Sequence, residues 1–344
     1  MSILYQDDDA FVVSHKKYID SVYEEIGYQI HPDLFNIPVP YKLLQPKKQT
    51  DINATPCKSF EELCREVQFV EDTYKKLKDK SILNTFCSEC EEQLNTVALQ
   101  FLKYLRSNKN WIENLVKNAF GANIGKVTVK TIDENNYLFP EDSKFYSKDI
   151  NEIHNHLDAK YDLIILDPPW WNKFIHRKRK ATGDGYQMMY NNDIKSIPIE
   201  NMLNENGIVV VWCTNSTQHF SCLTKEIFPK WQVTFTGKWF WLKVTSCGEP
   251  VCQFSVPPRK QPFEKIIFGF KKPPKEFPSK LIISIPSIID SHKPPLVEIL
   301  KPYLPEKPHC LELFARYLLP GWTSYGNEVL KLQHESIYVN KPQL

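Results

Sequence analysis

The pattern of hydrophobic and polar positions divides the chain into three parts. Residues 1–58 mix short apolar runs with several prolines and form an N-terminal segment. From residue 59 apolar side chains recur every three or four positions, as on one face of a helix, after a capping box at 59–62. Further helical stretches follow over 94–105 and 111–120. The pattern therefore predicts a mainly helical middle region over 59–140.

After residue 126 the pattern changes to short apolar runs that are typical of strands. A short candidate lies at 127–130, and the stronger ones are 163–166, 208–212, 239–243, 266–270 and 310–314. Several are almost continuously apolar, as expected of strands covered on both faces. Helical stretches at 194–203 and 297–300 lie between them. Residues 141–344 are therefore predicted to form an α/β domain with a mostly parallel central sheet flanked by helices.

Composition narrows the class of protein. The chain has 344 residues, of which 42% are hydrophobic and 24% charged, as in globular proteins. No apolar run approaches the roughly 18 residues needed to span a bilayer, and the N-terminus lacks a signal-peptide core. The net charge is +2, so contacts with nucleic acid must come from local patches. Nine cysteines without a secretion signal indicate reduced thiols in a cytosolic or nuclear protein.

The candidate chemistry is concentrated at Asp167-Pro168-Pro169-Trp170, directly after the apolar run 161–166. Ligand sites of open α/β sheets lie at this end of the strands. The two prolines fix φ and remove two N–H donors, which predicts a stiff turn whose carbonyls stay free as acceptors. Such a turn suits an exocyclic amine, because it offers acceptors for two N–H groups and a ring to stack on the base. An acidic residue after a strand could instead simply cap a turn.

The tetrapeptide resembles the signature of the DPPW-type adenine-N6 methyltransferases, the MT-A70-like family, and most closely its methyltransferase-like protein four branch. Three further segments resemble family motifs in the family's order: S-H-K-P-P-L at 291–296, L-E-L-F-A-R at 311–316 and P-G-W-T-S-Y-G-N-E at 320–328. The resemblance covers roughly 141–344. It implies a Rossmann-like methyltransferase domain that uses S-adenosyl-L-methionine and releases S-adenosyl-L-homocysteine. The G-x-G loop of many methyltransferases is missing, as it is in the family.

The resemblance also implies roles for individual residues. The catalytic residues would be Asp167, Pro168, Pro169 and Trp170, with Asp167 and the Pro168 carbonyl holding the amine by electrostatics and position. The cofactor would be bound by Asp149, Ile150, Asp167, Pro169, Lys293, Arg316, Asn327 and Glu328. Lys293 would pair with the cofactor carboxylate, Arg316 would meet a carboxylate or the ribose, and Asn327 and Glu328 would reach the ribose hydroxyls.

Substrate contacts are predicted beside the tetrapeptide. The candidates are Trp170, Trp171, Lys173, Arg177, Lys178, Arg179, Lys180 and Asn215. The basic run 176–180 would meet phosphates, although a solvated loop or a nuclear import signal has the same composition. Trp171 could stack on a base or pack in the core. The basic loop 257–260 is a weaker candidate. The lone C-x-x-C at 87–90 is interpreted as structural, and no metal is expected.

The resulting hypothesis is an adenine-N6 methyltransferase acting on RNA, with 2′-O-methyladenosine in a U2-type small nuclear RNA as the target that the resemblance implies. Adenine in DNA is an alternative, because no motif encodes how a 2′-oxygen is read. A catalytically silent RNA-binding scaffold is another alternative, but the intact tetrapeptide, Lys293, Arg316 and Asn327 argue against it. We expect a nuclear protein that can also occur in the cytoplasm. A monomer is expected, and the sequence identifies no partner.

Overall fold

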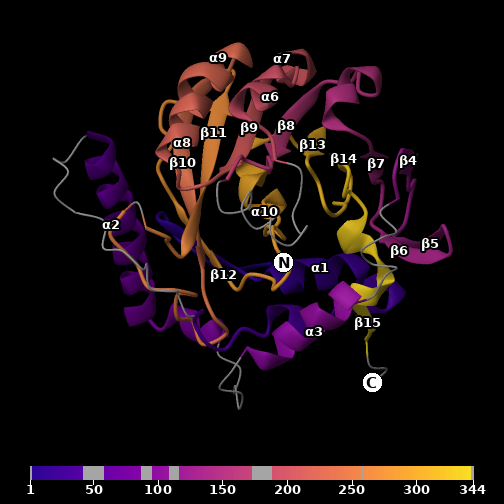
Figure 1. Ribbon diagram of the computed structural model, residues 1–344, viewed down its shortest axis with the longest axis horizontal. Helices are drawn as coiled ribbons and strands as arrows, with labels where there is room; N and C mark the ends of the chain where they lie inside the picture. Colours follow the sequence, from indigo (N-terminus) through magenta and orange to yellow (C-terminus); the bar gives the residue numbers. More distant parts are fainter. Residues whose placement is uncertain are drawn as a thin grey trace.

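The computed structural model describes residues 2–41, 58–86, 95–107, 116–172, 188–257 and 259–341. An 11-stranded sheet in the order β1-β2-β12-β10-β11-β9-β8-β13-β14-β7-β4 runs through the centre of the molecule (Figure 1). Its strands are β1 (Ile3–Gln6), β2 (Ala10–Val13), β4 (Ala119–Ala122), β7 (Lys144–Ser147), β8 (Tyr161–Leu166), β9 (Leu203–Cys213), β10 (Thr234–Lys243), β11 (Phe263–Phe270), β12 (Leu281–Ser284), β13 (Cys310–Leu313) and β14 (Thr323–Tyr325). Two small sheets pair β3 (Tyr28–Ile30) with β15 (Tyr338–Asn340), and β5 (Thr128–Ile132) with β6 (Asn135–Phe139).

The middle of the large sheet is parallel. β7, β14, β13, β8 and β9 pair in parallel, so their carboxyl ends meet at one edge. β11 is antiparallel to both β9 and β10, and therefore β10 runs in the direction of β9. β12 and β2 continue that direction. This arrangement is the predicted α/β class with a mostly parallel sheet flanked by helices, and the prediction is confirmed.

Helices cover both faces of the sheet. Successive strand residues point to opposite sides, so each face presents side chains for helices to pack on. In β8, Ile164 and Leu166 are buried toward one face and Leu163 and Ile165 toward the other. The first face carries α2 (Lys58–Asp79), α6 (Asn191–Ser196), α7 (Ile199–Met202), α8 (Thr217–Cys222) and α9 (Phe228–Lys230). The second carries α1 (His15–Tyr23), α3 (Thr96–Ser107) and α10 (Val297–Leu300). Short 3₁₀ segments are η1 (Glu24–Ile26), η2 (Pro32–Phe35), η3 (Ile82–Phe86), η4 (Ile150–Asn155), η6 (Lys301–Tyr303), η7 (Lys331–Gln333) and η8 (Glu335–Ile337), and η5 (Leu223–Ile227) is a π-helical turn.

The predicted strands are present, and most of them are longer than the apolar runs indicated. The helix expected over 194–203 is broken into α6 and α7, because Pro198 disfavours a helical conformation of Ile197 before it. The helix expected over 111–120 is wrong at its end, since Phe120 lies in β4 and pairs with β7. Phe120 is 70% exposed and stacks on Tyr146, so its apolar side chain belongs to a sheet edge and not to a helix face.

Strands from the first 140 residues belong to the central sheet. β2 pairs in parallel with β12, and its residues Ala10–Val13 are all buried. β1 pairs with β2, and β4 pairs with β7 at the opposite edge. The divisions at residues 58 and 140 stay predictions, but neither N-terminal part stands apart from the sheet.

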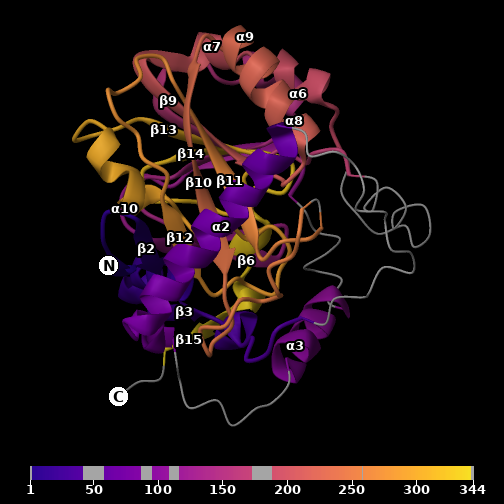
Figure 2. The same cartoon turned by 90° about the vertical axis from the view of Figure 1, so that its left-hand side faces the viewer.

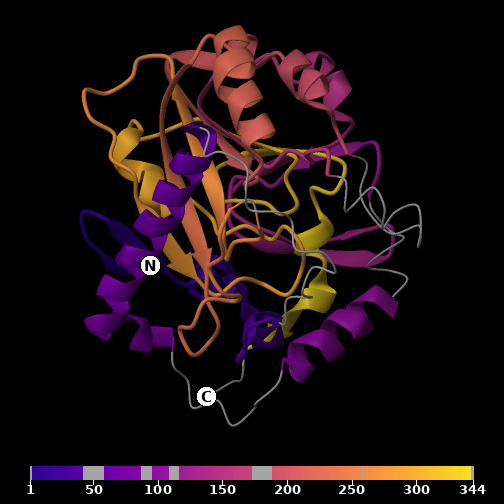
Figure 3. The same cartoon turned by 60° about the vertical axis from the view of Figure 1, so that its left-hand side comes forward.

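Buried ion pairs fasten α2 to the sheet. Lys265 of β11 is 1% exposed, and its Nζ lies 2.7 Å from Glu66 of α2. Lys238 of β10 contacts Glu62 at 2.6 Å and Glu66 at 2.5 Å. Figures 2 and 3 show α2 running alongside the strands that it covers. Because removing one partner of a buried pair costs about 3–5 kcal/mol, the buried Lys265–Glu66 pair holds the helix in position.

Candidate active site

Asp167 follows β8 at the point where the order of the strands reverses. β9, the next strand in the chain, lies on one side of β8, and β13 lies on the other. In open α/β sheets the crevice at such a switch point is where ligands bind.

The corner after β8 is held by backbone hydrogen bonds. The Trp170 N–H donates to the Pro168 carbonyl at 2.8 Å, and the Met189 N–H donates to the Pro169 carbonyl at 2.8 Å. The prediction that the carbonyls of this turn stay free is therefore wrong for Pro168. A carbonyl oxygen has a second lone pair, so it can accept one further N–H. Trp170 is 4% exposed, and its indole Nε1 donates to the Trp212 carbonyl at 2.8 Å.

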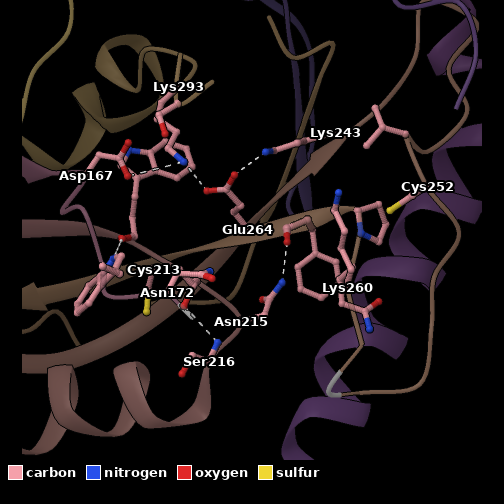
Figure 4. Close-up of a pocket in the computed structure, with 18 of the residues that line it drawn as sticks. Asp167, Asn172, Cys213, Asn215, Ser216, Lys243, Cys252, Lys260, Glu264 and Lys293 are labelled. Carbon is pink, nitrogen blue, oxygen red and sulfur yellow. Dashed lines mark hydrogen bonds and ion pairs between the residues drawn. The ribbon is translucent and has the colours of Figure 1, made fainter. Parts of the chain in front are cut away.

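A cavity of about 720 Å³ opens at the carboxyl edge of the sheet (Figure 4). Residues from several elements line it: Asp167 to Trp170, Asn172, Trp212 to Thr217, Lys243, Arg259 to Glu264, Lys293 and Arg316, with Leu63 of α2 and Tyr41. The cavity therefore brings together Asp167, Asn215, Lys293 and Arg316, which the sequence placed far apart. Trp171 does not line it and faces a neighbouring groove.

A chain of charged groups crosses this cavity. Lys293 contacts Glu264 and lies with its Nζ 3.7 Å from Oδ1 of Asp167. Lys243 pairs with the other oxygen of Glu264 at 2.5 Å. The Lys293 ammonium also lies 5.2 Å from the Trp212 ring and 5.8 Å from the Trp241 ring, within cation–π range. Lys293 is 7% exposed, so it is a fixed cation in the wall of the cavity.

Burial and these neighbours set the protonation of the site. Burial raises the pKa of Asp167 above its usual value, and the cations Lys293 and Arg316 offset only part of the effect. Burial alone would also raise the pKa of Glu264, but Lys243 and Lys293 outweigh it and lower that pKa to about 2. Burial lowers the pKa of Lys293, yet Asp167 and Glu264 together raise it above the usual value. At neutral pH Glu264 is therefore negatively charged and Lys293 is positively charged.

A buried acid lies beneath the corner. Glu312 of β13 pairs in register with Ile165 of β8 and is 7% exposed. Burial, followed by the charge of Asp167, raises the pKa of Glu312 to about 8. Its Oε2 has no hydrogen-bond partner among the described residues, and the same holds for the Ser324 hydroxyl on the adjacent strand. Glu312 is therefore protonated at neutral pH.

Asn215 lines the cavity and carries a buried acceptor without a partner among the described residues. Its side-chain nitrogen donates to the Phe263 carbonyl at 2.8 Å, which fixes the orientation of the amide. Its Oδ1 is buried and has no hydrogen-bond partner in the described part of the chain. A buried acceptor without a partner is rare in proteins, and a ligand N–H would satisfy this one.

The remaining candidates for cofactor contact lie along the same edge of the sheet. Arg316 follows β13, and its Nε lies 3.0 Å from the Glu328 carboxylate, which also pairs with Lys331 at 2.9 Å. Asn327 precedes Glu328 after β14 and is exposed. A Cβ at Gly326 would lie 3.1 Å from both the Ala315 nitrogen and the Phe314 Cα, so glycine permits this close approach.

Asp149 and Ile150 follow β7. The Asp149 side chain caps η4 by accepting from the Asn151 N–H at 2.9 Å, and its carbonyl accepts from the Tyr325 hydroxyl at 2.8 Å. Ile150 is buried. These two residues, Asn327 and Glu328 stand at the carboxyl ends of β7 and β14 but do not line the 720 Å³ cavity.

Several predicted residues lie outside the described part of the chain. These are Lys173, Arg177, Lys178, Arg179 and Lys180, and the two cysteines of the C-x-x-C. The second basic loop, which the sequence ranked lower, does reach the cavity through Arg259 and Lys260. Lys243 and Glu264 were missed altogether. The available signal was a charged residue at the terminus of each of two strands, Lys243 at the end of β10 and Glu264 near the start of β11.

A mostly parallel sheet with helices on both faces and a ligand cavity at its switch point defines a Rossmann-like fold of the methyltransferase class. The MT-A70 family model matches residues 161–328, a range that begins with β8 and ends at Glu328. Residues 161–328 therefore form an MT-A70 family domain.

Curated relatives carry related names. The chain is 34% identical over 262 residues to the mouse "N(6)-adenine-specific methyltransferase METTL4", an alignment covering 72% of this chain and 54% of the mouse protein. It is 28% identical over 373 residues to the Caenorhabditis elegans "DNA N6-methyl methyltransferase", covering 98% and 100% of the two chains. It is 31% identical over 228 residues to the Pyricularia oryzae "N6-methyladenosine RNA methyltransferase MTA1", covering 62% and 59%. The chain thus spans little more than half of the length of the mouse relative.

No helix in the described residues is long and apolar enough to cross a bilayer.

Proposed function

We propose that this chain transfers a methyl group from S-adenosyl-L-methionine to N6 of adenine in RNA. The proposed target is 2′-O-methyladenosine in a U2-type small nuclear RNA, which implies a nuclear protein. The MT-A70 family domain and the names of the mouse and Pyricularia relatives support adenine-N6 methylation. Adenine in DNA is the second candidate, which the name of the Caenorhabditis relative supports.

The charges of the cavity fit the cofactor. The amino-acid end of S-adenosyl-L-methionine carries one ammonium and one carboxylate. Asp167 is suited to the ammonium, and Lys293 and Arg316, which line the same cavity, are suited to the carboxylate. Asp149, Ile150, Asn327 and Glu328 at the ends of β7 and β14 would hold the nucleoside end. When bound, the cofactor supplies a methyl group on a positively charged sulfur.

The observation that carries the proposal is a cluster of acceptors in one cavity. Asp167, the second lone pair of the Pro168 carbonyl and the unpartnered Oδ1 of Asn215 can accept N–H groups there. Adenine presents its N6 amine as a pair of donors. Holding both donors aligns the amine and favours a more pyramidal nitrogen, which raises its reactivity. These residues act by position and electrostatics, as hydrogen-bond acceptors that orient the amine.

Nucleic acid would approach over the cations of the rim. Arg259 and Lys260 both line the cavity, and Figure 4 shows Lys260 on the side away from Asp167. Arg and Lys contacts to phosphates supply most non-specific affinity. Trp170, which lines the cavity, would provide aromatic surface for the target base, and Trp171 lies in the adjoining groove, where it would contact another part of the substrate.

The proposal is tested with purified full-length chain, labelled methyl donor and three matched oligonucleotides: RNA, RNA with a 2′-O-methyl adenosine, and DNA. We expect label at adenine N6, most rapidly in the 2′-O-methylated RNA. Asp167→Ala should abolish transfer while leaving the circular dichroism spectrum unchanged. Faster labelling of DNA than of either RNA would favour the second candidate. Calorimetry that detects no cofactor binding by the folded chain would instead favour a catalytically silent scaffold.

A further inference from the structure

A second open space adjoins the candidate active site. This groove, of about 850 Å³, is lined by residues on either side of the 173–187 segment and by α8. Asn172, Thr214 and Ser216 line both the groove and the cavity that contains Asp167. A polynucleotide whose target base enters the cavity would therefore pass over the groove with a neighbouring nucleotide.

Two aromatic rings are among the residues that line the groove. The Trp171 and Tyr190 rings are nearly parallel, with an angle of 16° between them and centroids 6.4 Å apart. Tyr190 is 64% exposed, whereas most aromatic side chains of the described residues are buried. Exposed aromatic rings are the surfaces on which single-stranded nucleic acids stack their bases.

The remaining lining residues are mostly polar and almost uncharged. It offers the amides of Asn191, Asn192 and Gln218 and the hydroxyl of Ser221, groups that both donate and accept hydrogen bonds. Among the described lining residues the charged one is Glu226, whose carboxylate lies 3.4 Å from the Lys195 ammonium. An acidic group disfavours a phosphate, whereas amides suit the edge of a base. The lining therefore fits a nucleobase better than a backbone phosphate.

The groove is joined to the catalytic corner by direct bonds. The Trp171 carbonyl accepts from Nε2 of His219 at 3.0 Å, and Nδ1 of the same ring contacts the Asn191 side-chain amide at 2.8 Å. The Trp171 N–H donates to the Met189 carbonyl at 3.1 Å, and the Met189 N–H donates to the Pro169 carbonyl. A base held here would stand at a fixed offset from Asp167, which is what positioning of a neighbouring target requires.

We propose that this groove binds the nucleobase directly next to the target adenine of a single-stranded RNA, stacked on Trp171 and Tyr190. The identity of the target rests on the function proposed above. Binding of the neighbouring base does not require methyl transfer, so the two can fail separately.

The test couples a change in the protein to a change in the RNA. Fluorescence anisotropy measures the affinity of the full chain for a short labelled RNA containing the target adenosine, with the 5′ or the 3′ neighbour either intact or abasic. We expect Tyr190→Ala to weaken binding of the intact RNA about 5- to 10-fold. At one of the two neighbours, the abasic RNA should bind wild type and Tyr190→Ala equally well.

Two control variants separate stacking from other effects. Tyr190→Phe keeps the ring and should bind like wild type, as should Tyr104→Ala, which removes a 58% exposed tyrosine from α3. The inference is overturned if Tyr190→Ala binds intact RNA like wild type, or weakens intact and both abasic RNAs to the same extent. Methyl transfer is recorded on the same samples. If Tyr190→Ala and the abasic RNA show the expected dependence but wild type labels no adenine, the proposed function is wrong and the groove remains a base-binding site.

Discussion

Replacing Glu312 by glutamine should stabilise the fold at neutral pH, and the gain should grow with pH. The carboxyl is buried, and burial raises its pKa from 4.5 to about 8. Below about pH 4.5 the group is neutral in the folded and unfolded states alike. Between about pH 4.5 and about pH 8 only the unfolded state releases the proton, so wild-type stability is lost across this window and stays lost above it.

The size of the effect follows from the two pKa values. The wild type forgoes about 1 kcal/mol of stability at about pH 5 and about 4 kcal/mol at about pH 7.5, so the difference between variant and wild type should widen by about 3 kcal/mol. Glutamine has nearly the shape of glutamic acid but cannot ionise. Any difference in how the two side chains pack or hydrogen-bond in the core shifts the comparison by an amount that does not depend on pH.

The assay is urea unfolding followed by tryptophan fluorescence at several pH values. Glu205→Gln serves as the matched control, because its side chain is 92% exposed and its removal should leave the pH profile unchanged. If the free energies of unfolding of Glu312→Gln and wild type differ by the same amount at every pH, the conclusion that Glu312 is neutral in the folded protein is refuted.

Two further predictions concern the charged wall of the cavity. Glu264→Gln leaves Lys243 and Lys293 without their shared anion and should destabilise the fold by about 3 kcal/mol at neutral pH, measured by urea unfolding. Because the pKa of Glu264 is lowered to about 2, this difference in stability should shrink as the pH falls below about 4.5. A loss of stability that stays constant with pH would contradict the ion-pair account. Charge reversal of Arg259 and Lys260 should weaken RNA binding and reduce the slope of log affinity against log salt by about 1.4 or more, with cofactor affinity from calorimetry unchanged; an unaltered slope would show that neither side chain contacts phosphate.

Local pattern was enough to predict the centre of the fold. The apolar runs in β8, β9 and β11 mark strands covered on both faces, and each run lies inside the observed strand. The family motifs named Asp167, Lys293 and Arg316, and the structure brings them to one cavity. Roles for these residues stay predictions, but their convergence follows from parallel strands whose carboxyl ends share an edge.

The features that could not be predicted from the sequence depend on contacts between segments that are far apart in the chain. Glu264 meets Lys243 because β10 and β11 are antiparallel with Leu242 opposite Phe263, a register that no local pattern encodes. Glu312 is acidic in a strand that is otherwise apolar, and its neutral state follows only from burial under the corner. Phe120 continues a helix-like spacing of apolar residues in the sequence, but in the structure it lies in β4 and pairs with the edge strand β7.

The pairing of β2 with β12 has a consequence for biosynthesis. Leu281 emerges from the ribosome about 270 residues after Ala10, its partner in the sheet, so at about 5–20 residues per second the earlier strand waits about 15–50 s for it. During that time an apolar strand with unsatisfied backbone groups is exposed on the nascent chain, where it invites aggregation. We therefore expect a chaperone, or transient contacts within the growing chain, to shield this strand until about four-fifths of the polypeptide has been made.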